Sequence, residues 1–156
     1  MLESGVNPNL TDAEGNDFLH YALIRRNIGD LLPLAIKNGL DVNKLNEKTK
    51  LLPLDRALEY ENLTMARILV EAGAVSSKSY EKLINEIIKL QHDFIVLDFA
   101  PNSMVFTAYR FILAVYRASG RDKTIIKNAR GHSIWHGKPN FQIFLENIEK
   151  YDKIWP

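Results

Sequence analysis

Three glycines recur at equal intervals through the first half of this 156-residue sequence. They are Gly5, Gly39 and Gly73, and the last two directly follow the helix-like segments 31–38 and 65–72. A glycine after such a segment is typical of a helix end, because the residue there adopts a positive φ that is costly for other residues. The constant interval from one glycine to the next, here called the repeat period, indicates stacked structural repeats.

A second pattern recurs between these glycines. Residues 17–22 read Asp-Phe-Leu-His-Tyr-Ala, and residues 52–57 read Leu-Pro-Leu-Asp-Arg-Ala. Residues 39–43 read Gly-Leu-Asp-Val-Asn, and residues 5–9 read Gly-Val-Asn-Pro-Asn. These stretches resemble the ankyrin-repeat family, whose repeats open with Thr-Pro-Leu-His-x-Ala and end with Gly-Ala-Asp-Val-Asn. The resemblance implies repeats built from a β-turn and two antiparallel helices.

The repeats depart from the family pattern at several positions. Asp17 replaces the usual threonine and can still cap a helix through its side-chain oxygen, whereas Leu52 cannot. Asp55 takes the place of the family's histidine, and the connection before Leu51 is one residue longer than in the first copy.

The second half resembles the family less. Residues 79–90 predict an amphipathic helix capped by Ser79, and residues 104–118 predict a longer helix that ends at Gly120. Apolar residues cover nearly the whole circumference of the longer helix, so we expect it to be central and buried. Residues 128–136 look like a further repeat opening when they are set beside residues 12–20.

The C-terminal residues predict a cap. Residues 140–151 have the apolar spacing of one amphipathic helix that closes the stack. The apolar end of the chain, which includes Trp155, is expected to fold back onto this cap; insertion into a partner is the alternative.

We therefore expect an all-α fold, an ankyrin-repeat-like solenoid of stacked antiparallel helix pairs joined by short β-turn or hairpin loops. It forms a single repeat domain over 1–156, with recognisable repeats in 1–76, an enlarged helix pair in 77–120 and a closing unit in 121–156. The chain begins inside a repeat, which predicts a fragment without its first helix. In the alternative, the exposed first face near Phe18 and Leu34 docks on a partner.

Composition excludes several classes of function. The chain has 20 Lys+Arg and 19 Asp+Glu, and this net charge of +1 gives no general attraction to nucleic acid or anionic membranes. It has no cysteine, which excludes disulfides, thiolate metal sites and cysteine nucleophiles. It also has no signal peptide and no apolar run long enough to span a bilayer, so we expect a cytoplasmic protein.

The resemblance places a protein-binding surface on the concave side, where turn tips and helix starts meet. The candidate contact residues there are Ala13, Glu14, Asn16, Ile24, Arg25, Lys48, Lys50, Glu59, Tyr60, Arg130 and His132. Mixed charge with an aromatic residue suits a protein partner better than a phosphate backbone, which favours a stripe of one sign.

The predicted function is to bind a partner protein without catalysis and to inhibit or position it. A toxin-neutralising immunity protein of a bacterium is the most concrete form of this hypothesis. A fragment of a larger scaffolding or host-directed adaptor is the alternative. No cofactor and no small-molecule substrate is expected.

A metal-dependent enzyme is the third alternative. His132 and His136 are four residues apart, which places two imidazoles on one helical face, but no glutamate base lies between them. The sequence contains no nucleophile elbow, phosphate loop or dinucleotide fingerprint. Arg121, Lys123, Lys127 and Arg130 form a small basic cluster, expected to be a solvated loop or a contact for an acidic patch.

Overall fold

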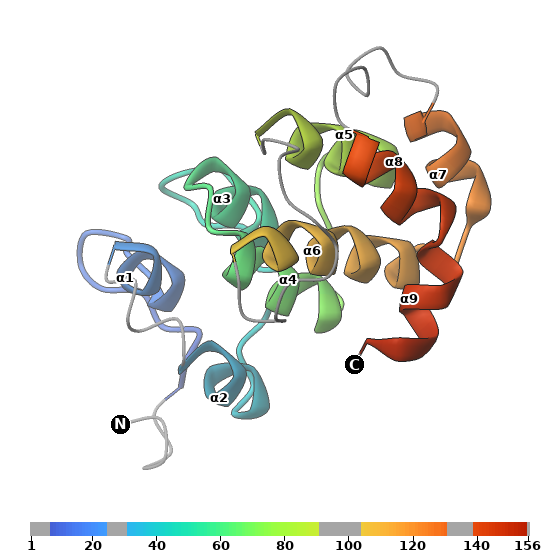
Figure 1. Cartoon of the computed structure of the whole chain (residues 1–156). Helices are drawn as coiled ribbons and strands as arrows, with labels where there is room; N and C mark the ends of the chain where they lie inside the picture. The colour runs from blue at the N-terminus through green and yellow to red at the C-terminus, as the bar shows by residue number, and fades with distance from the viewer. Residues whose placement is uncertain (1–6, 25–30, 91–103, 131–138, 156) are drawn as a thin grey trace. The chain divides into compact units, whose positions relative to one another are not determined.

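The structure is a computed structural model that describes residues 7–24, 31–90, 104–130 and 139–155. These residues form helices joined by turns and include no strand, so the all-α prediction is confirmed for them (Figure 1). None of their helices is long and apolar enough to cross a bilayer. The chain divides into two compact units, residues 1–77 and residues 78–156, here called the first and second units.

The described residues of the first unit form four short helices: α1 (Phe18–Ile24), α2 (Leu32–Lys37), α3 (Pro53–Glu59) and α4 (Leu63–Glu71). Helix α4 packs against both α2 and α3. Small and apolar side chains from all four helices form the core, namely Leu19, Ala22, Leu32, Ala35, Leu54, Ala57, Met65, Ala66 and Leu69.

The ends of these helices follow from local sequence. Asp17 begins α1, because its carboxylate accepts the backbone N–H of His20 at 3.0 Å, which confirms the predicted cap. Leu52 makes no side-chain cap, as predicted, and α3 relies instead on Pro53 in its first turn. Gly39 and Gly73 have φ values of 96° and 92°, which confirms the predicted helix stops.

The second unit contains α5 (Tyr80–Leu90), α6 (Met104–Ala118), α7 (Lys123–Arg130), α8 (Pro139–Glu146) and α9 (Ile148–Ile154). Helix α5 packs against α6 and α7, and α6 also packs against α9. Ser79 caps α5, where its hydroxyl accepts the N–H of Lys82 at 3.3 Å. The six consecutive residues 111–116 of α6 are all buried, so the prediction of a central helix is confirmed.

One prediction for the second unit is wrong, and another stays a prediction. Residues 128–130 are the last residues of α7, a helix that follows Asp122 and buries Ile126. Residues 131–136 lie outside the described residues, so the predicted repeat opening over 128–136 is not tested. The predicted single helix over 140–151 is divided at Asn147 into α8 and α9.

The division at Asn147 has a packing reason. In one continuous helix, Phe144 and Tyr151 would be separated by about 10 Å along the axis. In the structure their ring centroids are 5.1 Å apart, and Trp155 stacks on the same ring at 5.8 Å. The bend therefore gathers aromatic rings around Phe144, and it confirms that Trp155 folds back onto the cap.

Candidate functional site

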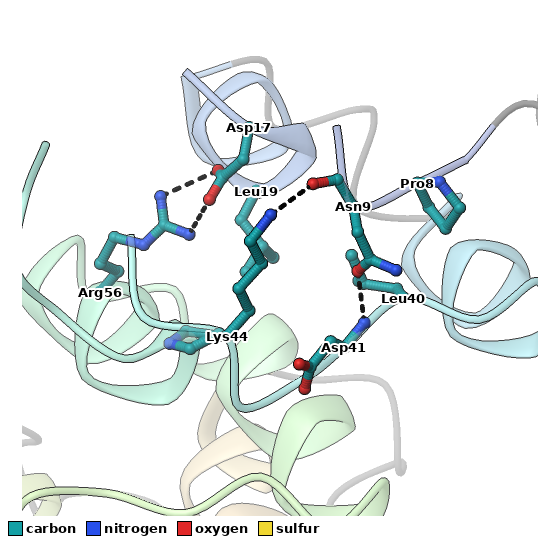
Figure 2. A pocket seen from close by; sticks show the side chains of 9 residues that line it. Pro8, Asn9, Asp17, Leu19, Leu40, Asp41, Lys44 and Arg56 are labelled. Atoms are coloured by element: carbon teal, nitrogen blue, oxygen red, sulfur yellow. Dashed lines mark hydrogen bonds and ion pairs between the residues drawn. The ribbon is translucent and has the colours of Figure 1, made fainter. Parts of the chain in front are cut away.

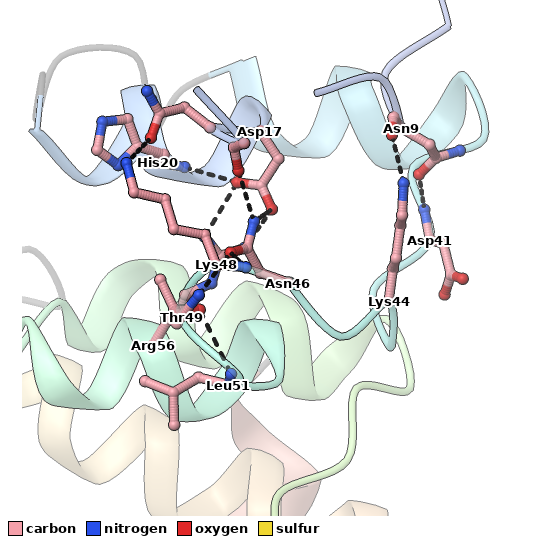
Figure 3. Close-up of polar contacts among 12 residues, drawn as sticks. Asn9, Asp17, His20, Asp41, Lys44, Asn46, Lys48, Thr49, Leu51 and Arg56 are labelled. Carbon is pink, nitrogen blue, oxygen red and sulfur yellow. Dashed lines mark hydrogen bonds and ion pairs between the residues drawn. The ribbon is translucent and has the colours of Figure 1, made fainter. Parts of the chain in front are cut away.

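The loops of the first unit are joined by asparagine side chains at the repeat period. The amide of Asn9 donates to the carbonyl of Gly39 at 2.8 Å and accepts the N–H of Asp41 at 2.6 Å. Asn43, one repeat period later, makes the same pair of bonds, to Gly73 at 3.3 Å and to Val75 at 2.8 Å. Each asparagine thus satisfies two backbone groups next to a helix-stop glycine. Figures 2 and 3 show the contact of Asn9 with Asp41.

A buried ion pair joins the starts of α1 and α3. The guanidinium of Arg56 is 3% exposed and donates to both oxygens of Asp17, at 3.0 and 2.7 Å (Figure 3). Asn46 donates to the same carboxylate at 3.0 Å. Burial raises the pKa of Asp17, but the hydrogen bonds from Arg56 and His20 outweigh it and lower the pKa below its usual value.

Two turns carry four of the exposed candidate residues, namely Ala13, Glu14, Lys48 and Lys50, and a polar side chain organises each turn. Asp12 accepts the N–H groups of Glu14 and Asn16, both at 2.9 Å. Asn46, which stands one repeat period after Asp12, accepts the N–H groups of Lys48 and Thr49 at 3.0 and 2.9 Å. Such side-chain bonds replace part of a backbone turn and hold its conformation.

The two turns differ by the one residue that the sequence indicates. Asp12 donates its N–H to Asn16 at 2.9 Å, whereas Asn46 donates its N–H to Leu51 at 3.2 Å and so encloses one more residue. The longer turn places Lys50 at a φ of 59°, a conformation that favours glycine, and the shorter turn uses Gly15 at 83°.

Three of the predicted contact residues come together where the turns meet. Lys48 donates through Nζ to Asn16 at 3.0 Å, and Asn16 donates to Glu14 at 3.3 Å. A Cβ on Gly15 would lie 3.4 Å from the Cβ of Lys48, so the turns are in close approach. Asn16 is only 7% exposed. The structure therefore corrects its expected role, because Asn16 holds the two turns together rather than offering surface.

The other described candidates are more scattered. Lys50 lies in the same turn as Lys48 and pairs with Glu47 at 3.0 Å, with both side chains well exposed. Glu59 and Tyr60 are exposed at the far end of α3, about 10 Å along the helix from the turns. Ala13 lies exposed at the tip of the first turn, and Ile24 lies exposed at the end of α1.

Several expectations fall where little is described. Arg25, His132 and His136 lie outside the described residues, and Arg130 is known only as the last residue of α7. Two cations of the predicted basic cluster are neutralised by α9, since Arg121 pairs with Asp152 at 2.6 Å and Lys123 pairs with Glu149 at 2.5 Å. Among the described residues, no group of three or more potential ligands could hold a metal ion.

A small hollow lies beside the buried ion pair, between the loops that carry Asn9 and Lys44 (Figure 2). Its volume is about 10 Å³, close to the room that one water molecule needs and far below that of a substrate pocket. Arg56 lines the hollow, and its buried Nε has no hydrogen-bond partner among the described residues.

Sequence reasoning missed the residues that organise this region. Asn9 and Asn43 recur at the same repeat period as the glycines, so their spacing was a usable signal. Arg56 had no such signal, because its partner Asp17 is 39 residues away, at the start of α1.

The tyrosine at the first turn has an electrostatic effect. The hydroxyl of Tyr21 donates to the carboxylate of Asp12. This bond, together with the backbone N–H of Asn16, lowers the pKa of Asp12 to about 2. Asp12 therefore stays ionised and keeps the turn organised through the ordinary acidic range.

Comparison of the chain with protein-family models, with curated proteins and with solved structures finds no match.

Proposed function

We propose that this chain is a non-catalytic, ankyrin-repeat-like module that binds a partner protein through the turns of its first unit. The contact surface, here called the turn surface, consists of Glu14, Lys48 and Lys50, with Tyr60 as a more distant anchor. Its action is stoichiometric: the bound module covers or positions the partner.

The observation that supports this proposal most directly is that the exposed charges lie on turns whose conformation is fixed by side-chain hydrogen bonds. Asp12 and Asn46 bind the backbone of the two turns, and the amide of Asn16 joins them. Binding costs free energy when loops and long side chains must be ordered. A surface that is already ordered loses less conformational entropy when it binds, which favours tight recognition of one partner.

The charge of the first unit supports a protein partner. Residues 1–77 contain 8 Lys+Arg and 11 Asp+Glu, a net charge of −3. A negative unit repels a phosphate backbone, whereas a turn surface with Glu14 beside Lys48 suits a mixed-charge protein surface. A bacterial immunity protein, which occludes the active-site cleft of a toxin, remains the most concrete form of the hypothesis.

The test is affinity capture from cells of the source organism, followed by calorimetric titration of the captured partner. We expect a one-to-one complex. Lys50→Glu and Tyr60→Ala should each weaken it about tenfold or more, because exposed charge and aromatic anchors carry much of an interface's energy. Lys37→Glu, the same charge reversal on an exposed residue of α2, is the matched control and should leave affinity within about twofold.

Equal affinity of Lys50→Glu, Tyr60→Ala and the unmodified protein would exclude the turn surface as the contact. For the immunity hypothesis, the captured protein must be a toxin whose activity stops at one equivalent of this chain. A captured partner that is not inhibited would support a binding module but exclude the immunity function.

A further inference from the structure

Charged side chains hold the last helix of the chain. Helix α9 presents two carboxylates, those of Glu149 and Asp152, to three cations that lie close together in the sequence. Arg117 and Arg121 each donate through Nε to a different oxygen of Asp152 at 2.6 Å, and Lys123 pairs with Glu149 at 2.5 Å. The three cations belong to the end of α6, the turn that follows it and the start of α7. One short segment therefore binds both carboxylates.

Arg117 also holds the backbone at the end of α9. Its Nη2 atom donates to the carbonyl of Asp152 at 2.9 Å and to the carbonyl of Trp155 at 2.6 Å. The last carbonyls of a helix have no partner inside the helix, so they need donors from elsewhere. Arg117 supplies two such bonds from another helix. Its guanidinium thus joins α6 to both the side chain and the C-terminal backbone of α9.

The turn between α6 and α7 holds Arg121 in a costly conformation. Arg121 has a φ of 61° and follows Gly120, which has a φ of 76°. A left-handed backbone is unfavourable for a residue with a side chain, and it persists where surrounding contacts compensate for it. Arg121 gains such contacts from Asp152, which it binds at 2.6 and 3.4 Å. The strained turn and the attachment of α9 therefore depend on each other.

The apolar contacts of α9 are few. Ile148 is its one buried residue, and Ile154 is 60% exposed. Tyr151 and Trp155 stack on Phe144 but remain partly exposed. By contrast, α6 has six consecutive buried residues. A seven-residue helix is unstable alone in water, and elements with little apolar burial open at a lower free energy than the core.

We propose that α9 is a releasable latch, which detaches from α6 and unfolds while the core of the second unit stays folded. The ion pairs to Glu149 and Asp152 set how often it opens. Arg121 and Lys123 are 59% and 75% exposed, so dissolved salt screens their contacts and favours the open state. Opening moves the aromatic rings of α9 away from Phe144 and frees three cations at once. The latch therefore exposes an aromatic ring and positive charge together when the ionic strength rises.

Amide hydrogen exchange of the full chain, followed by NMR, tests this proposal because it reports the open fraction at each residue. The N–H groups of Tyr151 and Trp155, which bond within the last helix at 3.2 and 2.8 Å, report α9, and those of residues 111–116 report the core. At about 0.05 M sodium chloride, both α9 groups should exchange about tenfold or more faster than the core groups, each relative to its unfolded rate. At about 0.5 M, both should accelerate about threefold, whereas the core rates should not change.

Three variants show whether the charged contacts control the opening. Arg117→Gln removes the cation that holds the helix end and should accelerate exchange of both α9 groups about tenfold or more. Glu149→Gln removes the more exposed pair, and we expect an acceleration of about twofold to threefold. Lys150→Gln is the matched control, because it removes an exposed cation of α9 that is not one of the three. It should leave both rates unchanged.

Three results would overturn the proposal. If the α9 and core groups exchange equally, α9 opens only when the whole unit unfolds. If salt accelerates only Trp155, or neither group, the helix end frays or the contacts are not electrostatic. If Lys150→Gln accelerates exchange as much as Glu149→Gln, the ion pair does not control the opening. Should circular dichroism show that Arg117→Gln does not fold, Glu149→Gln and the salt series decide alone. None of these outcomes depends on Lys50, so the proposed function is tested separately.

Discussion

The two units of this chain are stabilised by different means. In the first unit, helices of six to nine residues are joined by polar side chains, namely the amides of Asn9 and Asn43 and the ion pair between Asp17 and Arg56. In the second unit, the 15-residue helix α6 is buried over six consecutive residues, and aromatic rings surround Phe144.

This difference explains why residues of the first unit recur at the repeat period and those of the second unit do not. A hydrogen bond fixes distance and direction, so a repeated asparagine or glycine must recur at a set spacing. Apolar burial has no direction and depends on area, so α6 and the aromatic rings can pack well without any repeated spacing. The second unit also has polar contacts, since Arg117 and Arg121 both bind Asp152, but these do not recur at a repeat period.

The largest expected effect is in the aromatic core of the second unit. Phe144 is fully buried between Tyr109, Tyr151 and Trp155. Phe144→Ala should lower the free energy of unfolding by about 3–5 kcal/mol, because it removes apolar contacts and leaves a cavity. Chemical denaturation measures this loss. A loss below about 1 kcal/mol would contradict the view that apolar burial stabilises the second unit.

The next effect is at the buried ion pair of the first unit. Arg56→Ala should cost about 2–4 kcal/mol, since it leaves the partly buried carboxylate of Asp17 without its cation. Asp17→Asn in the same background should recover part of that cost, and denaturation of both single variants and the double variant measures the coupling. If the costs of the two single variants simply add, the pair does not join α1 to α3.

A smaller effect is expected at the asparagine bridges. Asn43→Ala should cost about 1–2 kcal/mol, because the carbonyl of Gly73 and the N–H of Val75 lose their partner. Hydrogen exchange of the Val75 amide should accelerate as well. Asn38→Ala is the control, because the Asn38 side chain bonds only within its own turn, to Leu34. Equal exchange rates of the Val75 amide in both variants would show that Asn43 does not stabilise this loop.

The smallest effect concerns acid. The pKa of Asp12 is lowered to about 2, chiefly by Tyr21, so its stabilising bonds are complete above its usual pKa of 3.8 and are lost as pH falls through about 2. Tyr21→Phe should raise the pKa of Asp12 toward 3.8, as measured by NMR of the carboxyl carbon. The pKa of Asp122, which Thr124 lowers, should not change. An unchanged pKa of Asp12 would show that the tyrosine does not control it.

Short-range signals in the sequence were reliable guides to the fold. The helix stops at Gly39 and Gly73, the caps at Asp17 and Ser79, and the bounds of α6 each depend on a few neighbouring residues, and the structure confirms them. Such features are local, because a cap or a left-handed residue satisfies groups within one turn of the chain.

Features that depend on distant partners were missed or wrong. The division between α8 and α9 brings Tyr151 and Trp155 onto the ring of Phe144, which also packs on Tyr109 from α6 at 4.6 Å. Asn16, which is expected at the surface, is buried, and Lys48, 32 residues later, donates a hydrogen bond to it. Neither contact leaves a mark in the spacing of nearby residues.

The sequence by itself determined an all-α chain with a constant repeat period in its first half, because glycine stops, helix caps and apolar spacing act over a few residues. Only the tertiary structure decided which polar residues are buried and which are exposed. Arg56 and Asn16 are polar side chains that look exposed in the sequence, yet the loops and helix starts that cover them come from other segments. Burial is a property of the packed neighbours, and those neighbours are assembled only when the chain folds.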